Sequence, residues 1–228
     1  MAVTDRLVGF SASGLTGVWA EENTREHIYD AFRRKETFAT SGPRIKVRFF
    51  SGYNFEDSKI NDLELIQKAY ANNLSMGSTI NIEEGRSPKF LVWAIADSMG
   101  APLQRIQIIK GWLENGEHRE KVYDVACSDG LVVNSSTFRC PDNGAKVDIE
   151  NCSISESLGA SELKTFWVDP DFLKNQRAFY YARVLENPVC RWSTWDSIRE
   201  GVKPRSDIPT TIQERAWTSP IWFEPTNS

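Results

Sequence analysis

The sequence predicts an α+β protein that is mainly β. Over most of the chain, short apolar or alternating runs are separated by Gly, Pro, Asn and Asp. This pattern is typical of the strands and turns of an antiparallel β-sandwich. Two segments show helical periodicity instead. The 228 residues, of which 40% are hydrophobic, can bury a core and suit one domain, or one domain with a piece of another.

The first patterned element is a helix within residues 22–36, "ENTREHIYDAFRRKE". Asn23 or Thr24 can cap its N-terminus, and Glu26 stands three residues after Asn23, as a capping box requires. An apolar stripe indicates a helix that packs on one side, because apolar side chains recur at helical spacing at Ile28, Ala31 and Phe32.

Strict alternation in residues 44–50 predicts a half-buried strand, with Ile45, Val47 and Phe49 on its inner face. The nearly continuous apolar run 89–96 predicts a central strand. The other expected elements are a helix over 62–73, a turn or bulge at Gly77, a hairpin of strands 105–114 and 120–127, strands at 163–169 and 176–186, and an extended tail over 214–225.

These elements divide into two expected units. Residues 1–42 form a helix-bearing unit, and residues 43–228 form a β-sandwich-like domain with a cysteine-bearing loop at 127–152. A strand–helix unit cannot bury both of its faces alone. The opening unit is therefore expected to be the last piece of something larger.

The bulk composition argues against several partners. The formal net charge is −4, which predicts no nucleic-acid partner and no binding to an anionic membrane surface. No apolar run reaches the length of a membrane span, so none is predicted. The first residues, "MAVTDRLVGFSASG", lack the basic and apolar regions of a signal peptide.

The cysteines suggest an oxidising compartment. Three of the four lie within the polar loop 127–152, and no pair has the C-x-x-C spacing of a zinc or redox site. An even count in a long loop favours disulfides, with three possible connectivities, over free thiols or a metal site. The candidates are Cys127, Cys140, Cys152 and Cys190. Disulfides would imply an exported protein, periplasmic or secreted, whose export signal is not in this chain.

Several motifs together resemble one bacterial family. They are the long stretch "SASGLTGVWAEENTREHIYDAFRRKETFATSGPRIKVRFFSGY" (11–53), "PKFLVWAIAD" (88–97), "QRAFYYARVLE" (176–186) and "TIQERAWTSPIWF" (211–223), in this order over nearly the whole chain. The chain resembles the C-terminal portion of the domain of unknown function 3604 family (DUF3604). That family is in turn similar to the polymerase and histidinol phosphatase (PHP) superfamily.

The resemblance implies an exported metal-dependent hydrolase with His and Asp ligands at the ends of barrel strands. Those ligands belong to the N-terminal portion of the family, so the missing barrel portion of the same protein is the expected partner. The helix, turn and strand that open this chain would close the barrel. A divalent metal (Mn, Zn or Fe) is expected in the full-length protein only.

The histidines of this chain do not supply a metal site. They are His27, in the first turns of the predicted helix, and His118, in a polar hairpin turn. The sequence contains neither Asp-x-His nor His-x-His. We therefore expect no catalytic residue, no metal ligand and no cofactor in this chain.

The loop before the first helix holds the substrate-pocket candidates. At a barrel rim, carboxylates and an indole can line a pocket, and backbone N–H groups at a helix start favour anions. The alternative is that the tryptophan packs, the asparagine caps the helix and the glutamates are solvated. The candidates are Trp19, Glu21, Glu22, Asn23 and Arg25.

Two other clusters of side chains each allow two interpretations. The side-chain oxygens of the cysteine loop could hold calcium, but without the EF-hand spacing ordinary turn chemistry is favoured at Asp129, Asp142, Asn143 and Asp148. A later aromatic and charged cluster could wall a ligand cleft, but is expected to anchor the β domain; it comprises Arg183, Arg191, Trp192, Trp195 and Asp196.

Two hypotheses of function follow. The first is the C-terminal region of an exported PHP-like metal-dependent hydrolase, which lacks the metal ligands and is inactive alone. The alternative is a stand-alone exported β-sandwich binding module for a carbohydrate or cell-surface partner. The aromatic content, with 8 Trp, 12 Phe and 6 Tyr, motivates this alternative.

Overall fold

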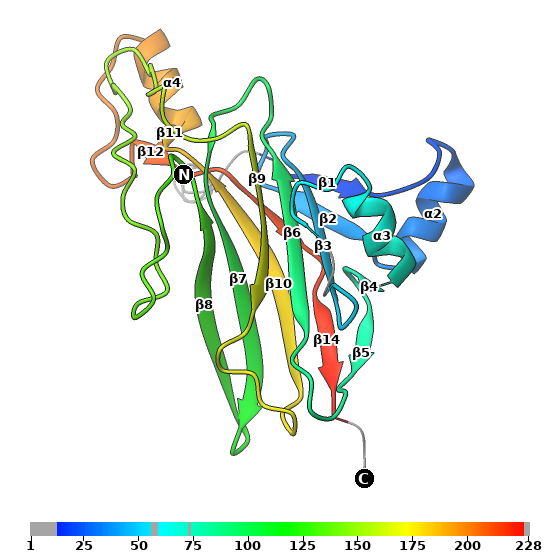
Figure 1. Cartoon of the computed structure of the whole chain (residues 1–228). Coiled ribbons are helices and arrows are strands. Elements are labelled where there is room, and N and C mark those ends of the chain that lie inside the picture. Colours follow the sequence, from blue (N-terminus) through cyan, green and yellow to red (C-terminus); the bar gives the residue numbers. More distant parts are fainter. Residues whose placement is uncertain (1–12, 56–58, 73, 226–228) are drawn as a thin grey trace.

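Two β-sheets pack face to face (Figure 1). The computed structural model describes residues 13–55, 59–72 and 74–225. The larger sheet has eight strands: β1 (Leu15–Val18), β2 (Thr37–Thr40), β5 (Thr79–Asn81), β7 (Leu103–Glu114), β8 (Glu117–Cys127), β10 (Ala178–Glu186), β13 (Arg215–Thr218) and β14 (Ile221–Glu224). The smaller sheet has four, in the order β4 (Leu74–Ser75), β3 (Lys46–Gly52), β6 (Lys89–Ile95) and β9 (Glu162–Val168).

Strand β10 organises the larger sheet. It pairs along its whole length with β7, which forms the predicted hairpin with β8. Its other edge is shared, because residues 178–180 pair with β14 and residues 183–185 pair with β13. These pairs are antiparallel, and β5 joins β14 in parallel. The expectation of a mainly β, sandwich-like fold is confirmed.

The core lies between the two sheets, as the alternation of apolar residues predicts. Ile45, Val47 and Phe49 are buried in it, and Lys46 on the opposite face of β3 is exposed. The apolar run of β6 is central, since β6 pairs with β3 on one side and β9 on the other. From the larger sheet, β10 sends Tyr180 into the same core.

The opening unit is continuous with the larger sheet. Strands β1 and β2 form an antiparallel pair, and β2 pairs with β13 near the other end of the chain. The described strands form no closed barrel, so the expected barrel-closing role is not confirmed. The division at residue 42 stays a prediction, and residues 1–12 of this unit lie outside the described residues.

Three helices flank the sheets in the described part of the chain: α2 (Arg25–Arg33), α3 (Leu65–Asn72) and α4 (Trp192–Arg199). The first two were predicted. Thr24, not Asn23, caps α2, because its hydroxyl accepts from the backbone N–H of His27 at 3.4 Å. The capping box proposed for Asn23 and Glu26 is therefore wrong. None of the described helices is long and apolar enough to cross a membrane.

Helix α4 was not predicted, and it separates the expected aromatic cluster. Trp192, Trp195 and Asp196 lie on α4, beside the short β11 (Val189–Cys190) and β12 (Thr211–Ile212) ribbon. Arg183 instead points from β10 to Gln107 of β7, with Nε donating to Oε1 at 2.7 Å. The five residues therefore do not form one site.

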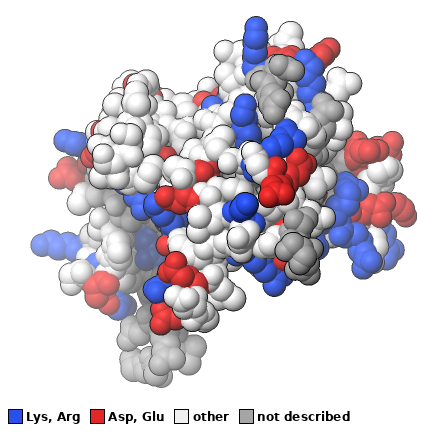
Figure 2. Space-filling model, turned by 60° about the horizontal axis from the view of Figure 1, so that its bottom comes forward, with Lys and Arg blue, Asp and Glu red and all other residues white. Residues whose placement is uncertain are grey.

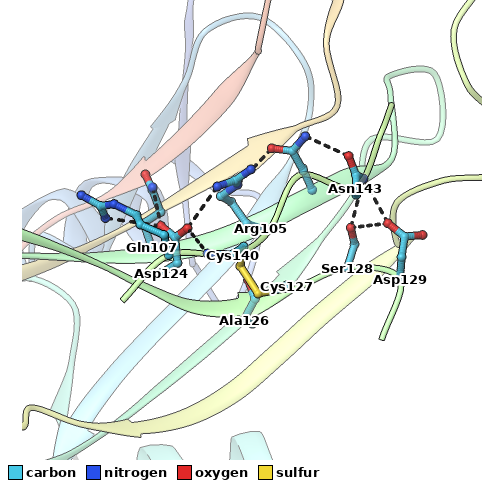
Figure 3. Close-up of a disulfide and its surroundings, with 11 residues drawn as sticks. Arg105, Gln107, Asp124, Ala126, Cys127, Ser128, Asp129, Cys140 and Asn143 are labelled. Atoms are coloured by element: carbon cyan, nitrogen blue, oxygen red, sulfur yellow. Dashed lines mark hydrogen bonds and ion pairs between the residues drawn. A yellow bond between two sulfur atoms is a disulfide. The ribbon is translucent and has the colours of Figure 1, made fainter. Parts of the chain in front are cut away.

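The cysteines form two disulfides, Cys127–Cys140 and Cys152–Cys190. The first lies beside the buried carboxylate of Asp124, as Figure 3 shows. Asp124 accepts hydrogen bonds from Gln107 Nε2 and from the backbone N–H of Cys140, each at 2.7 Å, and from Arg105 Nη1 at 3.1 Å. The loop is thus joined to the larger sheet covalently and through a buried charge.

The acidic side chains of the loop are hydrogen-bonded, through a local turn at Asp148 and through a contact outside the loop at Asp129. Asp129 accepts from Ser128 Oγ at 2.6 Å and from the backbone N–H of Gly159 at 2.8 Å (Figure 3 shows the first). Asp148 accepts from the N–H of Glu150 two residues later, which is an Asx turn.

Candidate functional site

Two pockets in the described part of the chain have volumes typical of ligand sites, about 820 Å³ and about 920 Å³. The pocket of about 920 Å³ contains residues that the sequence analysis predicted. It lies between the C-terminal end of α2, strand β3, helix α3 and the segment 74–79. These elements stand together on one side of the sandwich in Figure 1. Trp19 and Glu21, in the loop between β1 and α2, form part of its lining.

Arg48 is the most firmly held cation of the pocket. Alternation along β3 buries Val47 and Phe49, so Arg48 points to the opposite side. Its guanidinium carbon lies 3.5 Å from the ring centroid of Trp19, and its Nη1 donates to the Tyr70 hydroxyl at 2.6 Å. Trp19 is itself fixed, because its Nε1 donates to the carbonyl of Val47 at 2.8 Å.

A buried carboxylate lies behind this arginine. Glu36 is 5% exposed, and its Oε1 accepts from the Tyr70 hydroxyl and from Ser75 Oγ, the latter at 2.9 Å. Its Oε2 lies 3.4 Å from Arg34 Nη2. The carboxylate is therefore largely removed from water and compensated by three partners, which is how buried charges persist.

Tyr70 links the arginine to the carboxylate. Burial, followed by the hydrogen bond to Glu36, raises the pKa of Tyr70 to about 12. The phenol is thus neutral at physiological pH, donates to Glu36 and accepts from Arg48. Arg48, Tyr70 and Glu36 form a connected chain of hydrogen bonds whose geometry is set before any ligand enters.

Gly77 lets the segment 74–79 approach α2. Its φ is +88°, and a Cβ at this position would lie 2.5 Å from the carbonyl oxygen of Lys35 and 2.7 Å from that of Arg34. A side chain would therefore meet backbone atoms that cannot rotate away. The close approach places Ser75 within reach of Glu36.

Positive charge exceeds negative charge in the lining. Four cations face two carboxylates: Arg33, Arg34, Lys35 and Arg48 against Glu21 and Glu36. In the part of the chain that the structure describes, no ion pair engages Arg33 or Lys35. The pocket is suited to an anionic group, and an oriented guanidinium such as that of Arg48 can bind two oxygens of a phosphate or carboxylate.

The predicted site residues separate into two groups. Trp19 and Glu21 line the pocket, whereas Glu22, Asn23 and Arg25 are exposed and outside its lining. Glu22 lies 3.9 Å from His27 Nδ1. A substrate role for these five residues stays a prediction. The sequence analysis did not predict Glu36, Arg48 or Tyr70 as site residues. The one local signal was the position of Arg48 on the polar face of a predicted strand.

The described residues do not fit the metal that the PHP resemblance implies. Among residues 13–55, 59–72 and 74–225, no three His, Cys, Asp or Glu side chains are grouped so that they could hold a metal ion. His27 Nδ1 is within 2.6 Å of Thr24 Oγ1, and His118 is exposed on the β7–β8 hairpin. We therefore assign no metal-dependent step to these residues.

Comparison with known families identifies the chain. A family described as "Protein of unknown function (DUF3604)" matches residues 2–225. The chain belongs to the DUF3604 family. No curated protein and no solved structure matches this DUF3604 chain.

Proposed function

We propose that this DUF3604 chain is a non-catalytic β-sandwich region of an exported, PHP-like metal-dependent hydrolase, and that its pocket binds an anionic group of the substrate. The observation that carries the proposal is Arg48, held between Trp19 and Tyr70 in a pocket where cations outnumber carboxylates. A guanidinium held in place loses little conformational entropy when it binds an oxyanion.

The chemistry of the described residues favours binding over catalysis. Glu36 is already bonded to Tyr70, Ser75 and Arg34, which leaves it poorly placed to act as a free base. In this proposal the PHP-like barrel portion would hold any divalent metal (Mn, Zn or Fe). The unit at residues 1–42 would close that barrel. The sandwich would supply one wall of the substrate pocket.

Export is supported by the two disulfides. Structural disulfides persist in oxidising compartments and are rare in reducing ones. The first bridge joins the long loop to β8 of the larger sheet, and the second joins it to β11 of the β11–β12 ribbon. A periplasmic or secreted location of the full-length protein is the corresponding proposal.

The surface of α2 supports a covering partner such as the barrel portion. Tyr29 is 60% exposed and Phe32 is 50% exposed, and Ala31 is the residue of this helix that is fully buried. A helix of an isolated binding module is expected to bury its large apolar side chains against its own core. The exposed face therefore favours the hydrolase region over the stand-alone module.

Binding of inorganic pyrophosphate, measured by calorimetry at low ionic strength, tests the pocket. Arg48→Gln is expected to weaken binding by about tenfold, because a charge-assisted contact is lost. Lys46→Gln is the matched control: it removes the same charge from the same strand, but Lys46 is exposed and outside the lining. Absence of binding, or equal weakening by both substitutions, would contradict the proposal.

Phosphoester hydrolysis with added Mn²⁺ tests the non-catalytic role. The 228-residue chain is expected to show no rate above that of buffer. In the full-length protein, Arg48→Gln is expected to raise KM with a smaller effect on kcat, since the lost contact is made in both ground state and transition state. Turnover by the chain alone would overturn this part of the proposal.

A further inference from the structure

A second groove, of about 820 Å³, lies at the end of the sandwich where the β7–β8 hairpin turns. It shares no lining residue with the pocket around Arg48. Its walls come from the hairpin, the loop before β10 and the outer face of β14. Its lining is mainly apolar and includes aromatic rings with polar side chains around them, as ligand grooves commonly do.

Alternation along β10 puts aromatic rings on the outer face of the larger sheet. Ala178, Tyr180 and Ala182 point into the core, so Phe179 and Tyr181 point outward. These two rings are nearly parallel, with an interplanar angle of 14° and centroids 6.4 Å apart.

Phe179 lies flat against the neighbouring strand because that strand has no side chain there. Gly111 of β7 pairs with Phe179, and a Cβ on Gly111 would lie 2.3 Å from Phe179 Cζ. One face of the ring therefore covers Gly111, and the ring is held against the sheet. Trp222 of β14 lies beside it, with centroids 5.0 Å apart and planes at 45°. Together they form an aromatic platform in the groove.

The charges around the platform are balanced. Arg177 pairs with Glu224 at 2.8 Å, Arg119 pairs with Glu117 at 2.8 Å, and Lys174 lies 3.7 Å from Glu84. Figure 2, which brings this end of the molecule forward, shows Lys and Arg beside Asp and Glu rather than a surface of one sign. Each lysine and arginine that lines this groove therefore has a carboxylate partner, whereas Arg33 and Lys35 of the pocket around Arg48 are in no ion pair within the described part of the chain.

We propose that this groove binds a saccharide, through stacking of sugar rings on Phe179 and Trp222. A pyranose has a face of C–H groups that fits an aromatic ring and a rim of hydroxyls that needs hydrogen-bond partners. Side chains at the groove, including Asn175, Gln176 and Arg177, can supply those partners. A neutral ligand with both features matches a groove that is aromatic, polar at its rim and balanced in charge.

Calorimetric titrations with cellohexaose, maltohexaose and chitohexaose test the proposal on the intact chain. At least one of these neutral hexasaccharides is expected to bind, and Trp222→Ala is expected to weaken it about tenfold. Circular dichroism and the thermal midpoint show whether each variant is folded. Phe179→Ala gives a second, independent test of the platform.

Trp217→Ala is the matched control. Trp217 also lies on the outer face of the larger sheet, on β13. Both tryptophans have an arginine over the ring: the guanidinium carbon lies 5.9 Å from the ring centroid of Trp217 and 5.7 Å from that of Trp222. Trp217 does not line the groove. Binding that survives Trp217→Ala but not Trp222→Ala supports the saccharide site. No binding of any of the three sugars, or equal losses in both variants, overturns it without bearing on the pocket around Arg48.

Discussion

The ammonium group of Lys110 lies 2.7 Å from the carboxylate of Asp169 inside the sandwich. Lys110 is 2% exposed, and its Nζ also donates to the carbonyl of Asp171 at 2.7 Å. Tyr180 completes the cluster, because its hydroxyl donates to Asp169 at 2.7 Å. The ion pair joins β7 to the loop that follows β9, and so connects the two sheets.

Breaking this ion pair on one side is expected to be strongly destabilising. Lys110→Met leaves the Asp169 carboxylate buried without its cation, at a cost of about 3–5 kcal/mol in the free energy of unfolding. Urea denaturation measures this cost. Lys110→Met combined with Asp169→Leu is expected to cost clearly less than either single change, since no unpaired charge remains. Additive losses in the double variant would contradict this account.

Glu186 makes stability depend on pH. The side chain is 1% exposed, its Oε2 accepts from the N–H of Ala101 at 3.4 Å, and its Oε1 has no hydrogen-bond partner in the described structure. Burial, together with the negative charges of Glu214 and Asp97, raises the pKa of Glu186 to about 8 from its ordinary value of 4.5. The folded protein thus holds this proton more tightly than the unfolded chain does.

The direction of the effect follows from linkage. The stabilising contribution is complete below about pH 4.5 and is lost as the pH rises through about 8. Within this window the loss amounts to at most about 1.4 kcal/mol per pH unit. Glu186→Gln is expected to flatten this part of the stability profile, measured by urea denaturation from pH 4.5 to 9. A variant profile as steep as that of the native protein would show that another group is responsible.

The two disulfides are expected to differ in their contributions. The bridge Cys127–Cys140 closes a separation of 13 residues, and Cys152–Cys190 closes one of 38. In the chain-entropy account these loops correspond to about 3 and 4 kcal/mol respectively. Paired Cys→Ser variants, compared by urea denaturation under non-reducing conditions, should therefore show the larger loss for the second bridge. A larger loss for the first would indicate that contacts around Asp124 dominate.

Gly77→Ala tests the close approach of the segment 74–79 to α2. The new methyl group would meet the Lys35 carbonyl, so we expect a loss of more than about 1 kcal/mol of stability and weaker pyrophosphate binding. Gly85→Ala is the control, because Gly85 also has a positive φ (+73°) but a Cβ there meets nothing within 4 Å. Equal effects of the two substitutions on binding would contradict the role of Gly77 in the pocket.

Local patterns were sufficient for most strands and for two helices. Alternation at 44–50 and the apolar run at 89–96 correspond to β3 and β6, and the hairpin around Asn115 and Gly116 forms where the sequence predicted it. Both turn residues have positive φ, which asparagine and glycine tolerate best. Such features depend on neighbouring residues, and therefore they can be read from the sequence alone.

The sequence by itself thus determined the mainly β class and the DUF3604 resemblance, and it favoured disulfides over free thiols. Only the tertiary structure decided which cysteines pair, that β2 joins β13, and that Glu36 meets Tyr70 and Ser75. These contacts bring together residues that are far apart in the chain: Glu36 and Tyr70 are separated by 34 positions. Their partners are selected by how the two sheets pack and which groups are buried together, and no local periodicity contains that information.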